Sequence, residues 1–243
     1  MLEVDGLSAW YGRAQVLFGV SFLVAEGSCV ALLGRNGAGK STTVESVMGL
    51  VPGIAGRVRF RGEELAGAPP HRIARAGIGW VPEQRRVFTG LTVAENLEVA
   101  RRPAGPGVLP WTPERLYALF PNLGAMTDRP AGRMSGGEQQ MLAVARTLMG
   151  NPRLVLLDEP TEGVAPIVVE EMVRAILALK AEGVSLLVSE QNLQVAGLVA
   201  DRAVLLEKGE VRFDGAMRSL LDDAALQRAH LGMPDTTALA GNP

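Results

Sequence analysis

The feature that most constrains the fold is a glycine-rich stretch, residues 34–41, which reads GRNGAGKS. It follows the apolar residues 29–33 and precedes residues 40–50, whose composition favours a helix. Glycines let successive backbone N–H groups converge on one anion, and the positive end of the following helix dipole faces the same anion. A strand, this loop and a helix in that order therefore predict a phosphate-binding loop, and with it a nucleoside triphosphate as ligand.

The residues of this loop have distinct expected roles. Lys40 supplies a movable positive charge for the outer phosphates. Ser41 offers its hydroxyl to Mg²⁺, a hard cation that prefers oxygen ligands. The remaining nucleotide contacts are expected from Gly34, Arg35, Asn36, Gly37, Ala38, Gly39 and Thr42.

Composition excludes several classes of protein. The 243 residues carry a net charge of −2, so no nucleic-acid partner is expected. Cys29 is the only cysteine and lies in an apolar run, which suits a reducing compartment and excludes an intramolecular disulfide. Every apolar run stops well short of the ~18 residues that a membrane-spanning helix needs, and the acidic N-terminal residues do not fit a signal peptide. We therefore expect a cytoplasmic chain that reaches a membrane only through partners.

The apolar pattern predicts a mixed sheet with a helical insertion. Strand-like segments in the first third predict an antiparallel flank and span residues 2–7, 16–24 and 57–61. Residues of about 84–150 carry prolines and glycines between helical patterns, which indicates an inserted helical subdomain. Farther on, a helical stretch at 167–180 alternates with apolar strands, as in a parallel sheet, at 154–157, 184–188 and 203–207. We expect residues 1–243 to form one nucleotide-binding domain with a disordered tail at about 233–243.

Two acidic residues, Asp158 and Glu159, follow the apolar strand at 154–157. In doubly wound sheets, ligands bind at the carboxyl ends of the strands. We expect Asp158 to hold Mg²⁺ through water. Glu159, one residue farther, is expected to orient and polarise the water that attacks the γ-phosphate.

A second helix end with anion-binding character begins at Ser135, Gly136, Gly137 and Glu138. These residues stand just before an apolar-periodic helix at 141–148. On its own, a serine and two glycines before a helix indicate simple capping. Their position in the chain, between the phosphate loop and the acidic strand end, makes them candidates for the nucleotide site.

Together, the three motifs resemble the nucleotide-binding subunits of ATP-binding cassette (ABC) transporters, over residues of about 2–231. The resemblance implies an α/β fold of the P-loop NTPase class, with a mostly parallel core sheet, an antiparallel β flank and the inserted helical subdomain. It implies ATP as the nucleotide and Tyr11, in a short loop before the first strand pair, as the aromatic that stacks on adenine. It also implies head-to-tail pairing, in which residues 135–138 of one subunit close on the ATP held by the other.

Three further segments resemble most the LivF-type ATPase of branched-chain amino acid importers, at residues 80–88, 161–166 and 188–192. This implies an ATPase that couples ATP binding and hydrolysis to the transport of leucine, isoleucine or valine. The implied partners are a second, different ATPase subunit, two membrane permease subunits and, indirectly, a periplasmic substrate-binding protein. A self-dimer stays open as the other form of pairing. The resemblance also implies a peripheral protein on the inner face of the plasma membrane.

Three residues depart from the general cassette pattern. Glu83 stands where most cassettes have a glutamine, so a carboxylate is expected to face Mg²⁺, unless the glutamine that follows takes the role after a small backbone shift. Gln191 stands where a histidine contacts the γ-phosphate, and a neutral amide cannot carry a positive charge. Ala165 replaces the aspartate of the segment that crosses to the partner. We expect a competent but slow site, with Glu159, Lys40 and Gln191 as its catalytic residues.

Other functions stay open at this point. An importer for urea or short amides would have a similar ATPase subunit, because the transported molecule does not touch it. A nucleotide-dependent assembly module with little hydrolysis would fit Gln191 but not the intact Glu159. A soluble cassette ATPase acting on ribosomes or DNA usually carries two cassettes or a long coiled-coil insertion, and neither is seen here. Residues 88–99 are expected either to dock the membrane subunits or only to pack the helical subdomain.

Overall fold

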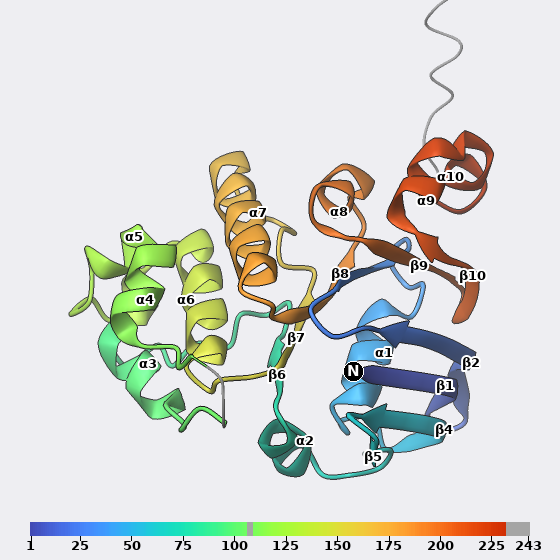
Figure 1. The fold of residues 1–243 in the computed structure, drawn as a ribbon, viewed down its shortest axis with the longest axis horizontal. Helices are drawn as coiled ribbons and strands as arrows, with labels where there is room; N and C mark the ends of the chain where they lie inside the picture. Colours follow the sequence, from blue (N-terminus) through green and yellow to red (C-terminus); the bar gives the residue numbers. More distant parts are fainter. Residues whose placement is uncertain (106–108, 232–243) are drawn as a thin grey trace, which may run out of the picture.

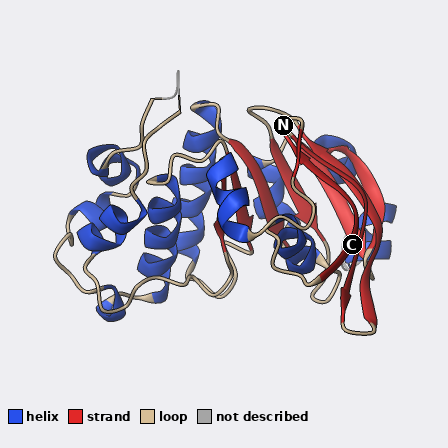
Figure 2. Ribbon diagram, turned by 90° about the horizontal axis from the view of Figure 1, so that it is seen from below, coloured by secondary structure: helices blue, strands red, loops and turns tan. Residues whose placement is uncertain are grey.

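The computed structural model describes residues 1–105 and 109–231. The disordered tail predicted at about 233–243 lies outside the described residues. The described chain forms two sheets, with helices packed against them and gathered at one end (Figures 1 and 2). Within these residues, no helix combines the length and the apolar character needed to cross a membrane.

The first sheet is antiparallel and has the order β2-β1-β4-β5. Its strands are β1 (Leu2–Tyr11), β2 (Ala14–Val24), β4 (Gly53–Phe60) and β5 (Glu63–Glu64). The predicted antiparallel flank is therefore confirmed, with strands longer than expected. The placement of Tyr11 in a loop was wrong, because Tyr11 pairs with Ala14 and ends β1. The turn between the two strands is short, and its Gly12 has a φ of 61°, which glycine adopts without strain.

The second sheet is mostly parallel and has the order β10-β9-β3-β8-β7-β6. Its strands are β3 (Cys29–Leu33), β6 (Ile78–Val81), β7 (Leu154–Asp158), β8 (Ser185–Glu190), β9 (Arg202–Glu207) and β10 (Glu210–Ala216). Only the β9–β10 pair is antiparallel among the pairs described. Every residue of β3, β7 and β8 is buried, as expected for parallel strands covered on both faces.

The register of these strands brings the candidate residues to one edge of the sheet. Leu33, the last residue of β3, lies beside Glu190, and Asp158 lies beside Ser189. Parallel strands point their carboxyl ends the same way, so the loops after β3, β6, β7 and β8 meet there. The sheet thus gathers segments that are more than a hundred residues apart in sequence.

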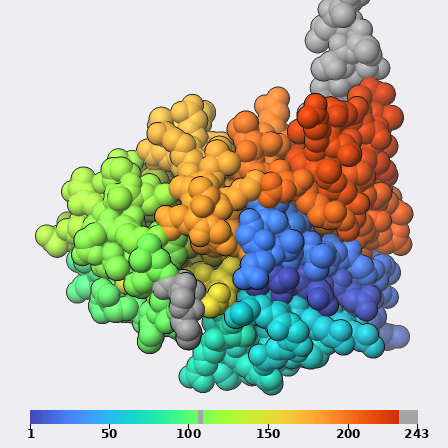
Figure 3. Space-filling view, viewed as in Figure 1, coloured from blue at the N-terminus to red at the C-terminus, as the bar shows by residue number. Residues whose placement is uncertain are grey.

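The helices flanking the sheets are α1 (Lys40–Val47), α2 (Pro70–Ala76), α7 (Pro166–Ala181), α8 (Leu193–Val199), α9 (Met217–Asp222) and α10 (Ala224–Leu231). The predicted helical insertion contains α3 (Val93–Ala100), α4 (Pro113–Leu119), α5 (Pro121–Gly124) and α6 (Gly136–Leu148). In Figures 1 and 3, these green to yellow segments lie at the end of the molecule away from the antiparallel sheet. Leu97, Leu116 and Phe120 are buried among them.

Helix caps explain where several of these helices begin. The Thr112 side chain accepts a hydrogen bond from the Arg115 amide, and Pro113 opens α4. The side chains of Ser135 and Glu138 form a reciprocal capping box, which starts α6 at Gly136. The helix therefore begins five residues before the predicted start at 141, because the cap fixes the two glycines as its first turn.

Cys29 provides a direct test of the packed core. Its side chain is fully buried in β3, and burial raises the pKa of its thiol to about 12. At pH 8 the thiol stays almost wholly protonated, so we expect no reaction of the native protein with Ellman's reagent over an hour. In guanidinium chloride, one thiol per chain should react at once. Stoichiometric reaction of the native protein would contradict this packing.

Candidate active site

The phosphate loop has a backbone that only glycine permits at key points. Gly34 has a φ of 154°, and a Cβ there would lie 2.5 Å from the backbone oxygen of Leu206 and 2.8 Å from the Cβ of Ala38. Gly39, just before α1, has a φ of 107°, which lies in the left-handed region. The loop therefore folds tightly back over β3 and aims the first turn of α1 into the site.

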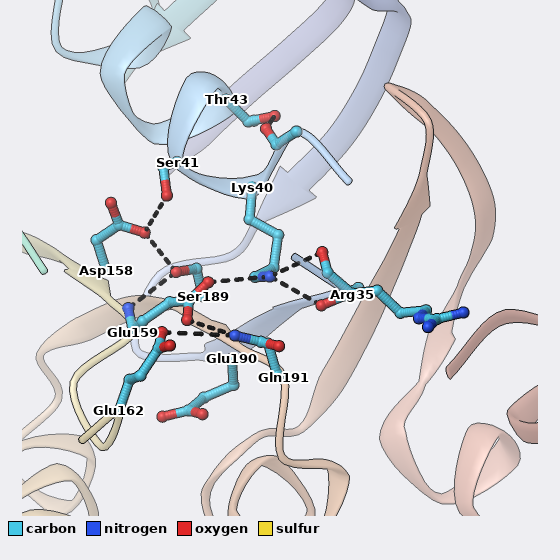
Figure 4. Close-up of polar contacts among 12 residues, drawn as sticks. Arg35, Lys40, Ser41, Thr43, Asp158, Glu159, Glu162, Ser189, Glu190 and Gln191 are labelled. Carbon is cyan, nitrogen blue, oxygen red and sulfur yellow. Dashed lines mark hydrogen bonds and ion pairs between the residues drawn. The ribbon is translucent and has the colours of Figure 1, made fainter. Parts of the chain in front are cut away.

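Lys40 is buried and makes three polar contacts within the loop and across to β7 (Figure 4). Its Nζ donates to the backbone oxygens of Gly34, at 2.8 Å, and Arg35, at 3.2 Å. The same atom lies 3.0 Å from Glu159 Oε1. An ammonium group on a flexible stem can exchange the carboxylate for phosphate oxygens, which suits the role predicted for Lys40.

Ser41 and Asp158 come together although 117 residues separate them. The Ser41 hydroxyl donates to Asp158 Oδ1 at 3.2 Å, and the Ser189 hydroxyl donates to the same oxygen at 2.6 Å. Burial raises the pKa of Asp158. No cluster of three or more His, Cys, Asp or Glu suited to a metal occurs within residues 1–105 and 109–231. A hydroxyl beside one carboxylate could hold an Mg²⁺ that takes its other ligands from phosphates and water.

Glu159 is the centre of a polar network at the end of β7. Gln191 Nε2 lies 2.8 Å from Glu159 Oε2 and 3.4 Å from Glu162 Oε2 (Figure 4). Burial alone would raise the pKa of Glu159, but hydrogen bonds from Glu162, Gln191 and Lys40 outweigh it and lower that pKa below its ordinary value. The hydrogen bond to Glu159, with burial, raises the pKa of Glu162 to about 7. Glu159 therefore carries the negative charge of this pair.

These groups open into a cleft of about 410 Å³. It is lined by Val16, Asn36, Gly37, Gly39, Lys40, Ser41, Thr42, Glu83, Glu159 and Glu162. Glu83 lines the cleft, whereas Gln84, the alternative to it, is an exposed residue outside this lining. A region with cationic Lys40 and loop amides on one side and carboxylates on the other can bind a metal–phosphate group.

The sequence reasoning missed three residues of this site. Ser189 orients Asp158 and also accepts a hydrogen bond from the Glu159 amide at 3.0 Å. Glu162 holds Gln191, and Val16 forms part of the cleft wall. Only Glu162 had a local signal, since it lies one turn after Glu159 in the same loop; the other two depend on the pairing of distant strands.

Two predicted regions lie apart from the cleft. Residues 135–138 form the N-cap and first turn of α6, and none of the described residues that line the cleft comes from that helix. Tyr11 is also not part of the lining. Its ring is 44% exposed, and its hydroxyl donates to Glu45 Oε2, on α1, at 2.9 Å.

Comparison with known proteins identifies the architecture. Residues 17–162 match the sequence family described as ABC transporter. A nucleotide-free ATP-binding cassette from an ABC transporter superposes with a TM-score of 0.81 and 26% identity, over 97% of this chain and 99% of that one. A cassette in its ADP conformation gives a TM-score of 0.79 and 26% identity, over 93% and 96% of the two chains.

Full-length relatives extend the match to nearly the whole chain. The branched-chain amino acid transport ATP-binding protein BraG of Pseudomonas aeruginosa is 42% identical over 96% of this chain and its own full length. A probable LivF of Archaeoglobus fulgidus is 36% identical over 97% of this chain and its own full length. The lipopolysaccharide export ATP-binding protein LptB of Escherichia coli K12 is 33% identical over 95% of this chain and 97% of its own length. This chain therefore belongs to the ABC transporter family, as one of its ATP-binding cassette ATPases.

Proposed function

We propose that this chain is the ATP-hydrolysing subunit of an importer for branched-chain amino acids. The identity of the substrate is supported by the similarity to BraG and LivF, both named for that transport, at 42% and 36% identity. The LptB proteins, named for lipopolysaccharide export, are less similar, at 33–34%. An importer of urea or short amides is the alternative, because no residue of this chain selects the transported molecule.

The cleft supports a specific arrangement of ligands. Backbone amides of the phosphate loop and Lys40 would hold the phosphates of ATP. Ser41 and Asp158 would hold Mg²⁺, and Glu83, which lines the same cleft, is a further carboxylate that the ion could use. When bound, Mg²⁺ supplies positive charge that stabilises charge developing on the γ-phosphoryl group.

Hydrolysis requires a base next to the γ-phosphoryl group of ATP, and the Glu159 carboxylate is suited to that role. Its carboxylate stays ionised and faces the same cleft as Lys40. It can therefore accept a hydrogen bond from a water and polarise it. Gln191 fixes the position of that carboxylate but adds no positive charge. These properties support a competent site with slow turnover.

A complete site needs a second ATPase chain. Gly136 and Gly137, whose amides are not part of the capping box, lie at an N-terminus of α6 outside the chain's own cleft. Head-to-tail pairing would bring this helix end to the γ-phosphate held by a partner, so that ATP binding favours association and hydrolysis favours release. Ala165 stands directly before α7 and makes no side-chain cap. The partner is a second ATPase subunit of the same importer or another copy of this chain.

The surface for membrane subunits is a groove between the parallel sheet and the helical insertion. This groove has a volume of about 280 Å³ and includes Trp80, Val99 and Arg146 in its lining. Next to it, the exposed ring of Phe88 lies under the Arg146 guanidinium, 4.8 Å from it. Of the predicted docking segment 88–99, Val99 lines the groove, and the rest of the lining comes mainly from α2, β6, α6 and the loops that follow α3 and α6. Docking of a permease subunit here would hold the chain on the inner face of the plasma membrane.

The proposed organisation is a single nucleotide-binding domain whose residues of about 84–150 form the helical subdomain. Within the described part of that segment, α3, α5 and α6 pack on one another around a shared apolar core. The same core continues into β7 and α7, through residues such as Val155 and Ile176. A continuous core of this kind supports one domain rather than two independent ones.

Co-purification tests the proposed assembly. We expect a tagged chain, extracted gently from membranes of its native cell with Mg-ATP, to bring with it two membrane subunits and a second ATPase. The gene neighbourhood of those subunits should encode a binding protein for leucine, isoleucine or valine. Recovery of ribosomal or DNA-repair proteins instead, or of no membrane protein, would contradict the transport function.

A further inference from the structure

Glu45 has no part in the nucleotide site described so far, yet it makes a specific contact with Tyr11. The carboxylate accepts the Tyr11 hydroxyl hydrogen bond at 2.9 Å, between the end of β1 and the middle of α1. The residues are 34 positions apart. Burial, helped by the hydrogen bond to Glu45, raises the pKa of Tyr11, so its hydroxyl remains a donor at neutral pH.

The position of Glu45 on α1 relates this contact to the phosphates. Glu45 lies four residues after Ser41, and residues at that spacing share one face of a helix. The hydrogen bond therefore fixes the tyrosine ring relative to the helix whose first turn carries Lys40 and Ser41. A base stacked on that ring would be held at a set distance from phosphates bound at the same helix.

The exposed Tyr11 ring gains from such an anchor, and Thr42 lies beside the same hydroxyl. It stands at the end of a hairpin and is 44% exposed. An aromatic surface that can rotate freely must be ordered when a ligand stacks on it, and that ordering reduces affinity. A hydrogen bond from its far end removes this cost before the ligand arrives.

We propose that Glu45 is a positioning residue for adenine, holding the Tyr11 ring by its hydroxyl so that the base of ATP stacks on a fixed surface. This inference rests on the proposed role of Tyr11 in adenine binding. Glu45 would then contribute to binding of a ligand that carries adenine and not to binding of the phosphates alone.

The test compares ADP with pyrophosphate, measured by calorimetry on the isolated chain with Mg²⁺, because neither ligand is hydrolysed there. Tyr11→Ala should weaken ADP binding roughly tenfold, the usual scale of one base–aromatic stack, and leave pyrophosphate binding unchanged. Glu45→Ala and Tyr11→Phe should each weaken ADP about threefold, the scale of one hydrogen bond. Glu45→Ala combined with Tyr11→Phe should bind ADP no more weakly than either of these two single variants, because both changes remove the same hydrogen bond.

Two further variants separate this effect from charge and from folding. Glu45→Gln keeps an oxygen acceptor and should bind ADP nearly as the wild type does. Glu3→Ala removes an exposed carboxylate from β1 and controls for the charge change. Loss of a negative charge near the phosphates would by itself strengthen the binding of both ADP and pyrophosphate. Weaker ADP binding in Glu45→Ala is the opposite change, so the lost charge cannot explain it.

The outcomes distinguish the inference from the function on which it rests. Unchanged ADP binding in Tyr11→Ala would remove Tyr11 from the adenine site, and the role of Glu45 with it. If Tyr11→Ala binds ADP more weakly but Glu45→Ala binds it as the wild type does, the adenine site stays in place and the inference about Glu45 is overturned. Equal losses of ADP and pyrophosphate in Glu45→Ala would also overturn it, since they would show that Glu45 supports the phosphate loop instead.

Discussion

Replacing Glu159 by glutamine is expected to lower ATP turnover by the assembled complex about 100- to 1,000-fold while leaving ATP binding intact. Glutamine has the shape of glutamate but cannot accept a proton from water, and loss of a general base commonly costs that much. Lys40 would keep an oxygen to contact in place of Glu159 Oε1, now 3.0 Å away. Steady-state phosphate release, measured on the complex, gives the turnover.

The same variant should make the ATP-bound assembly longer-lived, because hydrolysis is the step that releases the paired subunits. Glu26→Gln, which neutralises an exposed carboxylate outside the lining of the cleft, is the matched control and should turn over ATP at the wild-type rate. Unchanged turnover in Glu159→Gln would show that this chain acts as a nucleotide-dependent assembly module rather than as a hydrolase.

Replacing Lys40 by alanine is expected to weaken ATP binding by roughly 10- to 100-fold, because charge-assisted hydrogen bonds to phosphate contribute on that scale. The free energy of unfolding should also fall, by about 2 kcal/mol at pH 7.5, because removing one partner of a buried ion pair leaves the other uncompensated. Lys40 and Glu159 are 3% and 7% exposed, so little water is available to replace the lost contact. Calorimetry with ADP and urea unfolding measure the two effects.

The stability loss in Lys40→Ala should depend on pH in a defined direction. In the wild type the pKa of Glu159 lies below its ordinary value, so its contribution to stability is full at neutral pH and disappears as pH falls through that lowered pKa. The difference between wild type and Lys40→Ala should therefore shrink on acidification. Arg218→Ala, at an ion pair whose arginine is 93% exposed, should change stability little at any pH. A difference that grows on acidification would contradict the Lys40–Glu159 pairing.

Local sequence pattern was sufficient where one short segment determines an element. The strand at 29–33 has the predicted bounds, since it is an apolar run ended by glycine. The pattern failed at β4, which begins at Gly53 rather than at 57, because the glycines in its first half weaken the strand signal. A Cβ on Gly56 would lie 2.5 Å from the Gly6 oxygen, so this glycine is required by the close approach of β1.

The candidate site followed from sequence only in part. Lys40, Ser41, Asp158 and Glu159 stand in motifs whose spacing itself predicts their chemistry. The network around them depends on strand order: Ser189 reaches Asp158 because β7 and β8 are neighbours, although 31 residues separate the two. Likewise the bond between Tyr11 and Glu45 depends on how the antiparallel sheet packs on α1, which no local pattern encodes.

ATP hydrolysis by this chain is proposed to drive transport of branched-chain amino acids. Uptake of radioactive leucine by proteoliposomes containing the purified complex, its binding protein and ATP on the side of this chain tests it most directly. We expect accumulation of leucine with the wild type, competition by isoleucine and valine, and no accumulation with Glu159→Gln. Leucine uptake that persists in the Glu159→Gln complex would rule out coupling through this chain, and an ATP-driven complex that transports urea or short amides but not leucine would rule out the proposed substrate.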